Sequence, residues 1–264
     1  MKRFLLTSMA LLSVGTMAHA ADMPAYEAAP AMVDLPGHSW TGFYIGAQAG
    51  YALGSNDDND LEFDTDLDGS FDDTVLTGGG ADAFAPGFTS DFDDGFSGGL
   101  RIGYDHQVSN FVFGVVVDAS FVDVADRVNG LSVTPADYTF ERELNYLVTG
   151  RLRGGYAFDR FMVYATGGVA YGDIDYTFST NSPAAFAGAT EGDSDAWGYT
   201  VGAGAEMMLT QNISLGVEYL YTDLDVDTQT ARFTSGAFAP GTDLRPSEDE
   251  FDFHTLRATM AYRF

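Results

Sequence analysis

Residues 144–171, LNYLVTGRLRGGYAFDRFMVYATGGVAY, decide the fold of this chain. The stretch divides at Phe158-Asp159-Arg160 into two runs in which the side chains alternate in character. In the first run, Leu144, Tyr146, Val148, Leu152 and Tyr156 share one parity, and Asn145, Thr149, Arg151, Arg153 and Gly155 share the other. In the second run, Phe161, Val163, Ala165, Val169 and Tyr171 alternate with Tyr164, Thr166, Gly168 and Ala170.

A period of two over more than ten residues indicates a β-strand rather than a helix. Each run is long enough to cross a bilayer at a tilt. One face of each strand is apolar and ends in aromatic residues, whereas the other carries Arg, Thr, Asn and Gly. The stretch is therefore predicted to be a transmembrane β-hairpin with lipid on one face and a polar barrel interior on the other.

The same alternation recurs along the chain and predicts six further strands. They run from Trp40 to Tyr51, and over residues 96–105, 111–123, 197–208, 213–222 and 253–264. Short connections (107–110, 158–160, 210–212) alternate strictly with long ones (54–95, 124–142, 173–196, 223–251). This pattern predicts an all-β fold, an eight-stranded antiparallel up-and-down transmembrane β-barrel with its short turns in the periplasm. A soluble barrel of the lipocalin type is disfavoured, because Arg and Glu share the inward face with Gly and Thr.

Composition limits the partners that this protein can have. The formal net charge is -27, and Lys2 is the only lysine. So acidic a chain is not expected to bind nucleic acid, whose phosphates need basic contacts, and it favours cations as partners. The chain has no cysteine, which excludes disulfides and thiolate chemistry.

The domain boundaries follow from composition. Residues 1–20 are predicted to be a signal peptide, with Lys2 and Arg3 before an apolar run and a small-residue cleavage site at Ala18-His19-Ala20. Residues 21–39 contain three prolines and no pattern that would form a core, and we expect a periplasmic N-terminal tail. Residues 40–264 are predicted to be the outer-membrane β-barrel domain.

Three motifs carry a family resemblance. WTGFYIGAQAGY (40–51), GRLRGGYAFDRFMVYATGGVAYG (150–172) and the final Ala-Tyr-Arg-Phe resemble the small outer-membrane β-barrel surface proteins of alphaproteobacteria, which are relatives of the OmpA transmembrane domain. The resemblance implies eight strands in the cell outer membrane of a Gram-negative bacterium, and abundant surface antigens that stabilise the envelope. Some members of this family are reported as weak pores or haem binders. The acid-rich first loop departs from the family pattern, so activities borne by the loops do not carry over.

The partners expected of such a barrel are outer-membrane lipid and lipopolysaccharide. The last strand ends in Phe264, and an aromatic final residue resembles the signal that the outer-membrane assembly machinery reads. We expect a monomer.

Charged residues lie on the inward face of several predicted strands. They are Arg101, Asp118, Arg151, Arg153, Glu206, Glu218 and Arg257. Strand order places Glu218 near Arg257 and Asp118 near Arg151. Since eight strands leave an interior that side chains just fill, an ion-pair network that plugs the barrel is favoured over a charged pore lining. The alternative function is a narrow porin-like channel, or a barrel that binds or transports a small ligand such as haem.

An enzyme is not predicted. After removal of the signal peptide only His38, His106 and His254 remain. His38 lies in the predicted tail, His106 lies at a predicted periplasmic turn, and His254 has no obvious serine partner. A histidine beside a carboxylate, such as His254 near Asp252, is a weak signal by itself.

The first long loop is unusually acidic. Residues 54–94 hold thirteen Asp or Glu and no Lys or Arg, and we expect a solvated, disordered loop. Asp64, Asp66 and Asp68, followed by Gly69, match the start of a calcium loop, with Asp72 nearby. The twelfth position is Val75 where a bidentate Glu is required, so an EF-hand is excluded and weak calcium binding is the remaining prediction.

Overall fold

Eight antiparallel strands close into a ring. The computed structural model describes residues 38–54, 60–190, 195–247 and 249–264; the predicted signal peptide and nearly all of the predicted tail lie outside them. Each neighbouring pair of ring strands is hydrogen-bonded, and the last pairs with the first, which confirms the predicted fold class. In ring order the strands are β1 (Gly42–Gly54), β4 (Gly95–Val108), β5 (Phe111–Leu131), β6 (Asp137–Phe158), β7 (Phe161–Thr180), β9 (Asp195–Met208), β10 (Ile213–Asp225) and β13 (Glu250–Arg263).

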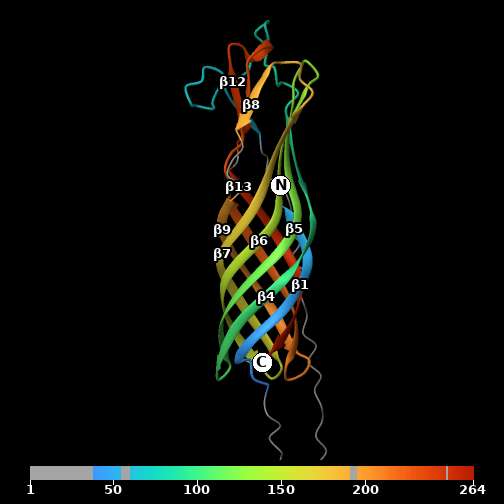
Figure 1. The fold of residues 1–264 in the computed structure, drawn as a ribbon, viewed down its shortest axis with the longest axis vertical. Coiled ribbons are helices and arrows are strands. Elements are labelled where there is room, and N and C mark those ends of the chain that lie inside the picture. The colour runs from blue at the N-terminus through green and yellow to red at the C-terminus, as the bar shows by residue number, and fades with distance from the viewer. Residues whose placement is uncertain (1–37, 55–59, 191–194, 248) are drawn as a thin grey trace, which may run out of the picture. The chain divides into compact units, whose positions relative to one another are not determined.

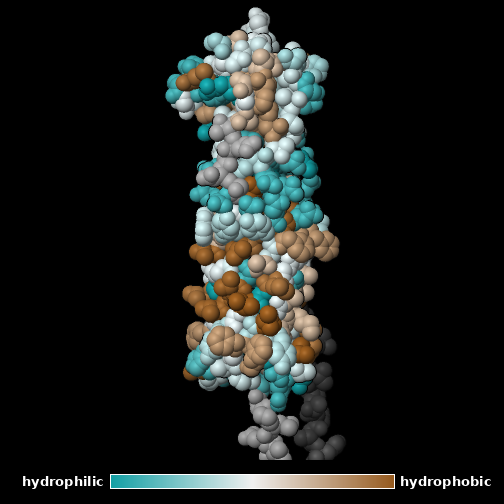
Figure 2. Space-filling model, in the orientation of Figure 1, coloured by the Kyte–Doolittle hydropathy of each residue, from teal (hydrophilic) through white to brown (hydrophobic). Residues whose placement is uncertain are grey.

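Alternation along the strands separates a lipid face from an interior. On β6, Leu152 is 68% exposed, while its neighbours Arg151 and Arg153 are buried. On β1, Phe43 is 67% exposed and Tyr44 is buried. Figure 2 shows hydrophobic side chains gathered over the part of the barrel nearer the tight turns, with a hydrophilic band above them. This apolar belt is the surface that a bilayer requires.

The tight connections all lie at the end of the barrel where the C-terminus lies (Figure 1). Only two residues separate β4 from β5 and β6 from β7. Ser109 and Asp159 in these turns have φ values of 58° and 54°, the left-handed region that two-residue hairpin turns need. Within the described part of the chain, no helix is long and apolar enough to span a membrane.

Three strands are much longer than the sequence predicts. β5, β6 and β7 have 21, 22 and 20 residues, so large parts of the expected loops 124–142 and 173–196 are strand. The extension of β6 contains a β-bulge at Asn145, because Leu144 pairs with Ile174 while Tyr146 pairs with Asp173.

The bulge corrects one sequence assignment. Alternation places Leu144 on the same face as Tyr146, but the extra residue reverses the alternation. Leu144 is consequently fully buried inside the barrel, whereas Tyr146 is 44% exposed on the outside.

A second, smaller sheet lies at the end of the barrel opposite the C-terminus (Figure 1). It consists of β2 (Leu61–Asp64), β12 (Thr242–Pro246), β11 (Thr230–Phe233) and β8 (Phe186–Thr190), in that order. β3 (Phe88–Asp93) pairs with the outer half of β5, next to the segment of β5 that pairs with β4. A short 3-10 helix, η1, covers Gly236–Phe238.

This small sheet, which we call the cap, packs on the extensions of β5 and β6 through an apolar core, the cap core. Its buried members include Phe63, Phe84, Tyr138, Phe233 and Phe238. Residues 60–94 of the first loop supply Phe63, Val75 and Phe84 to it, so the expectation of a disordered loop is wrong for that part. The charge count hides the apolar residues among the acidic ones: Leu61 and Phe63, on either side of Glu62, are both buried.

Another apolar cluster fills the outer half of the barrel interior. Leu144, Ile174, Leu224, Phe251 and Phe253 are all buried there. At the end of the barrel with the tight turns, a smaller cluster holds Trp40, which is fully buried, with Met162 and Met208. The charged residues that the sequence singles out lie on the strand segments between these two apolar clusters, and a further buried pair, Arg142 with Asp126, lies on the extensions of β6 and β5.

We predict that the Phe84→Ala substitution opens the first loop. The Phe84 ring lies 4.7 Å from the Phe63 ring and 5.3 Å from that of Tyr138, and a Phe→Ala change in a core costs about 3–5 kcal/mol. Cleavage of purified protein by proteinase K within residues 60–94 should become on the order of 100-fold faster, since it follows local opening. Leu76→Ala is the matched control, because Leu76 is 52% exposed. Equal cleavage rates in the two variants would contradict an ordered loop.

Candidate functional site: the charged barrel interior

Five charged residues from five strands meet in the middle of the barrel and form what we call the central cluster. Arg151 Nη2 lies 2.7 Å from Asp118 Oδ2, and Arg151 Nη1 lies 3.2 Å from Glu218 Oε1. Arg257 bridges the same two carboxylates, at 3.1 Å from Asp118 and 2.6 Å from Glu218. Arg101 contacts Glu218 alone, at 3.5 Å. All five side chains are almost completely buried.

Neutral side chains complete the bonding of the two carboxylates. Gln48 Nε2 donates to Asp118 over 3.0 Å, and the Thr149 hydroxyl donates to it over 2.8 Å. The Tyr164 hydroxyl donates to Glu218 over 3.0 Å. Each carboxylate thus accepts from several donors, as a buried charge requires.

A second group lies nearer the tight turns, and we call it the periplasmic cluster after the side of the membrane on which the sequence predicts these turns. Arg153 pairs with Asp105 through two hydrogen bonds and lies 3.1 Å from Glu206. Arg263 lies 2.9 Å from Asp105 and donates to the backbone carbonyl of Trp40. The Ser214 hydroxyl donates to Glu206 over 2.5 Å.

Two tyrosines stand around Arg153. The guanidinium carbon of Arg153 lies 4.9 Å from the centre of the Tyr44 ring and 5.1 Å from that of Tyr164, a double cation–π contact. Each ring lies over a glycine of a neighbouring strand. A Cβ atom on Gly103 would be 2.3 Å from the Tyr44 hydroxyl, and one on Gly204 would be 2.6 Å from the Tyr164 ring. Glycine at these two positions therefore gives the rings their space.

The structure brings together most of the residues that the sequence singles out. Arg101, Asp118, Arg151, Glu218 and Arg257 meet in the central cluster, with both pairs that strand order suggests. Arg153 and Glu206 lie in the periplasmic cluster instead, with Asp105 and Arg263.

Asp105 and Arg263 are site residues that sequence reasoning missed. The signal for both was present, because Asp105 has the parity of Arg101 on one strand and Arg263 has that of Arg257 on another. The roles of Tyr44 and Tyr164 were not visible, since nothing in the sequence tells how far an inward ring reaches across the barrel.

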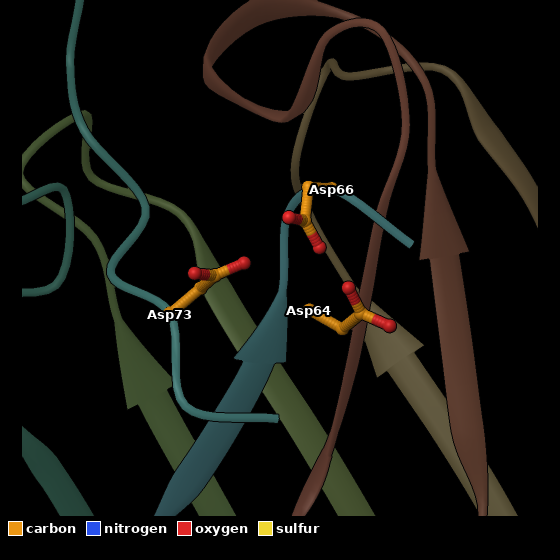
Figure 3. A group of neighbouring side chains, drawn as sticks. All are labelled: Asp64, Asp66 and Asp73. Atoms are coloured by element: carbon orange, nitrogen blue, oxygen red, sulfur yellow. The ribbon is translucent and has the colours of Figure 1, made fainter. Parts of the chain in front are cut away.

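The acidic loop brings a different set of carboxylates together than the sequence suggests. One oxygen from each of Asp64, Asp66 and Asp73 lies within 4.8 Å of the others. Figure 3 shows Asp64 at the end of β2 and the other two on the connection that follows. Asp68 instead accepts from the backbone N–H of Ser70, and the exposed Asp72 lies outside the group.

Hydrogen bonds already occupy much of this carboxylate group. The hydroxyl and the backbone N–H of Thr65 each donate to Asp73 over 2.7 Å and lower the pKa of Asp73. The backbone N–H of Asp68 lowers the pKa of Asp66, but desolvation and the neighbouring carboxylates outweigh it, so that this pKa is raised. Calcium binding by Asp64, Asp66, Asp68 and Asp72 stays a prediction. In the structure, the carboxylates that lie together are those of Asp64, Asp66 and Asp73, without Asp68 and Asp72.

A family model agrees with the closed ring and its apolar outer face. The model described as "Outer membrane protein beta-barrel domain" matches residues 7–264. The chain belongs to this outer membrane beta-barrel family. It is a protein of the Gram-negative outer membrane, as the sequence predicts.

Relatives of this outer-membrane barrel occur in alphaproteobacteria. The "31 kDa outer-membrane immunogenic protein" of Brucella melitensis biotype 1 is 33% identical over 273 residues, which cover 100% of both chains. The "22 kDa outer membrane protein" of Rhizobium leguminosarum bv. viciae is 28% identical and covers 76% of this chain and 74% of its own. Among solved structures, the outer membrane protein OprG from Pseudomonas aeruginosa covers 88% of this chain and 99% of its own at 15% identity, with a TM-score of 0.46.

We predict that Arg257→Ala strongly destabilises the barrel, because two buried carboxylates lose a partner. Breaking a buried pair in this way costs about 3–5 kcal/mol. The double variant with Glu218→Ala should cost less than the sum of the two single variants, measured by urea unfolding of purified protein.

Arg127→Ala is the control for this cycle. Arg127 also bridges two carboxylates, Asp93 and Glu141, but its side chain is 38% exposed, so the loss should stay below about 1 kcal/mol. Strictly additive losses at Arg257 and Glu218 would show that the central cluster is not coupled.

Proposed function

We propose that this protein is a structural barrel of the outer membrane whose interior is plugged by its own side chains and whose outer cap serves surface interactions. The observation that carries the proposal is the central cluster, in which two carboxylates tie side chains from β4, β6 and β13 together across the barrel. An ion that crossed this cluster would have to displace guanidinium groups from buried carboxylates, and each uncompensated charge costs about 3–5 kcal/mol.

Two apolar layers reinforce the proposed plug. On the periplasmic side Trp40 is fully buried, and the Arg263 guanidinium lies 5.3 Å from the centre of its ring. On the outer side the cluster with Leu144, Phe251 and Phe253 fills the interior with apolar side chains. A hydrated ion would lose its water in both layers, which is unfavourable.

The rival function is a narrow channel or a small-ligand barrel. For either, the space would have to come from separating Arg151 and Arg257 from their carboxylates, since these side chains cross the interior. We therefore favour envelope integrity over transport, and we propose no enzymatic activity. His254, on the outer face, is hydrogen-bonded to the Tyr219 hydroxyl over 2.8 Å, an arrangement that needs no catalytic role.

The proposed partners follow from the two ends of the barrel. The cap presents the acidic loop to the outside, where lipopolysaccharide and its divalent cations are the proposed contacts. Two of the similar Brucella proteins are named immunogenic, which fits exposure at the cell surface. At the other end Phe264 is 74% exposed beside Tyr262, and we propose that the assembly machinery reads it. The protein is proposed to act as a monomer.

We predict that the wild-type barrel shows no stable unit conductance in planar lipid bilayers. A variant with Arg101, Asp118, Arg151, Glu218 and Arg257 all changed to Ala removes the central cluster without leaving any of its charges unpaired, and should conduct through the space gained. Its barrel content is checked first by circular dichroism. Steady single-channel steps of the wild type, equal to those of the variant, would establish the channel function instead.

A further inference from the structure

The central cluster contains more positive than negative charge. Three guanidinium groups, those of Arg101, Arg151 and Arg257, face two carboxylates, Asp118 and Glu218. The periplasmic cluster is balanced, because Arg153 and Arg263 face Asp105 and Glu206. The two clusters together thus hold one positive charge in excess, in a place where an uncompensated charge is costly.

Arg101 is the group that carries this excess. Its ion pair, at 3.5 Å, reaches the Oε1 atom of Glu218 that also accepts from Arg151 and Tyr164. Arg151 and Arg257, by contrast, each contact both carboxylates. The Arg101 side chain is only 2% exposed, so solvent does not compensate for its weak pairing.

Two hydrogen-bond donors near this charge lack a protein acceptor. Arg101 Nε and the Tyr44 hydroxyl are both buried, and neither has a hydrogen-bond partner among the described residues. They are diagonal neighbours on the inner face of β1 and β4, since Tyr44 pairs with Gly103 and Gly46 pairs with Arg101. The Tyr44 hydroxyl lies over Gly103, two residues from Arg101 on the same face.

The chemistry of these two groups defines the ligand. A guanidinium N–H can only donate, and a tyrosine hydroxyl with no acceptor donates as well, so the missing partner is an acceptor. The single excess positive charge calls for a single negative charge. A doubly charged sulfate or phosphate would overcompensate it, and a water molecule would satisfy the donors but leave the charge.

We propose that the barrel interior binds one small monovalent anion, chloride in a physiological medium, between Arg101 Nε and the Tyr44 hydroxyl. One acceptor, Gln48 Oε1, also lacks a partner within the described part of the chain, and a water molecule beside the anion would donate to it. This anion site is a proposal separate from the plug. Conductance tests the plug, and halide binding tests the anion site whether or not the barrel conducts.

The first test is thermal unfolding of the detergent-purified protein in sodium chloride and in sodium gluconate at equal ionic strength. Gluconate is too large for a site between two side chains. The unfolding midpoint should be higher in chloride, by about 3 °C when chloride is about tenfold above its Kd, and it should rise with chloride concentration. Superimposed curves in the two salts would overturn the proposal.

Three variants locate the effect. Arg101→Met keeps the length of the side chain but removes the charge, so its midpoint should not depend on chloride. Tyr44→Phe removes one donor and should require a higher chloride concentration for the same midpoint shift. Arg127→Met, in the exposed ion pairs on the extensions of β5 and β6, should keep the wild-type dependence on chloride. A chloride effect that persists in Arg101→Met would place the anion elsewhere and overturn the assignment.

The second test does not depend on any variant folding. Crystals of the wild-type protein, refolded and grown in sodium bromide, should give an anomalous bromide peak in contact with Arg101 Nε and the Tyr44 hydroxyl. Density for water alone at this position, without an anomalous signal, would contradict the proposal.

Discussion

The pairing of buried guanidinium groups with buried carboxylates is the interaction on which the barrel interior depends. Eight strands enclose a space that side chains nearly fill, so an inward charge has no bulk water to solvate it. Each of the nine charged side chains in the two clusters therefore contacts at least one opposite charge, and the carboxylates at their centre accept from several donors. The neutral side chains of Gln48, Thr149, Ser214 and Tyr164 take the remaining positions.

The same strands serve two environments along their length. In the bilayer the outward face is apolar and the inward face is charged. Beyond it, β5, β6 and β7 continue as a sheet whose apolar inner face packs against the cap. The bulge at Asn145 is the device that adjusts β6 at this change, because it turns Leu144 inward where the alternation would have turned it to lipid. Bulges commonly mark such changes at the rims of barrels.

Much of this architecture could be predicted from the sequence, because alternation with a period of two is a local property. The strand order, the tight turns and the inward parity of Arg151 and Glu218 all follow from it. Two features could not be predicted in this way. An inserted residue such as Asn145 looks like any other polar residue until its neighbours are paired. The count of acidic residues in 54–94 conceals Phe63 and Phe84, whose partners in the cap core include distant residues of β11 and β12. The carboxylate group of Asp64, Asp66 and Asp73 depends on the path of that loop, whereas spacing alone favours Asp68 and Asp72.

Proton exchange at the arginine side chains tests the buried pairing most directly. In nitrogen-15 spectra of the protein in detergent micelles at neutral pH, the Nε–H groups of Arg153 and Arg257 should be resolved and exchange slowly with water, because they donate to Asp105 and Glu218 over 2.7 Å inside the barrel. The Nε–H of Arg127, whose side chain is 38% exposed, should exchange fast and be broadened. Equally fast exchange at all three arginines would mean that water fills the barrel interior, which would contradict a plug of buried ion pairs.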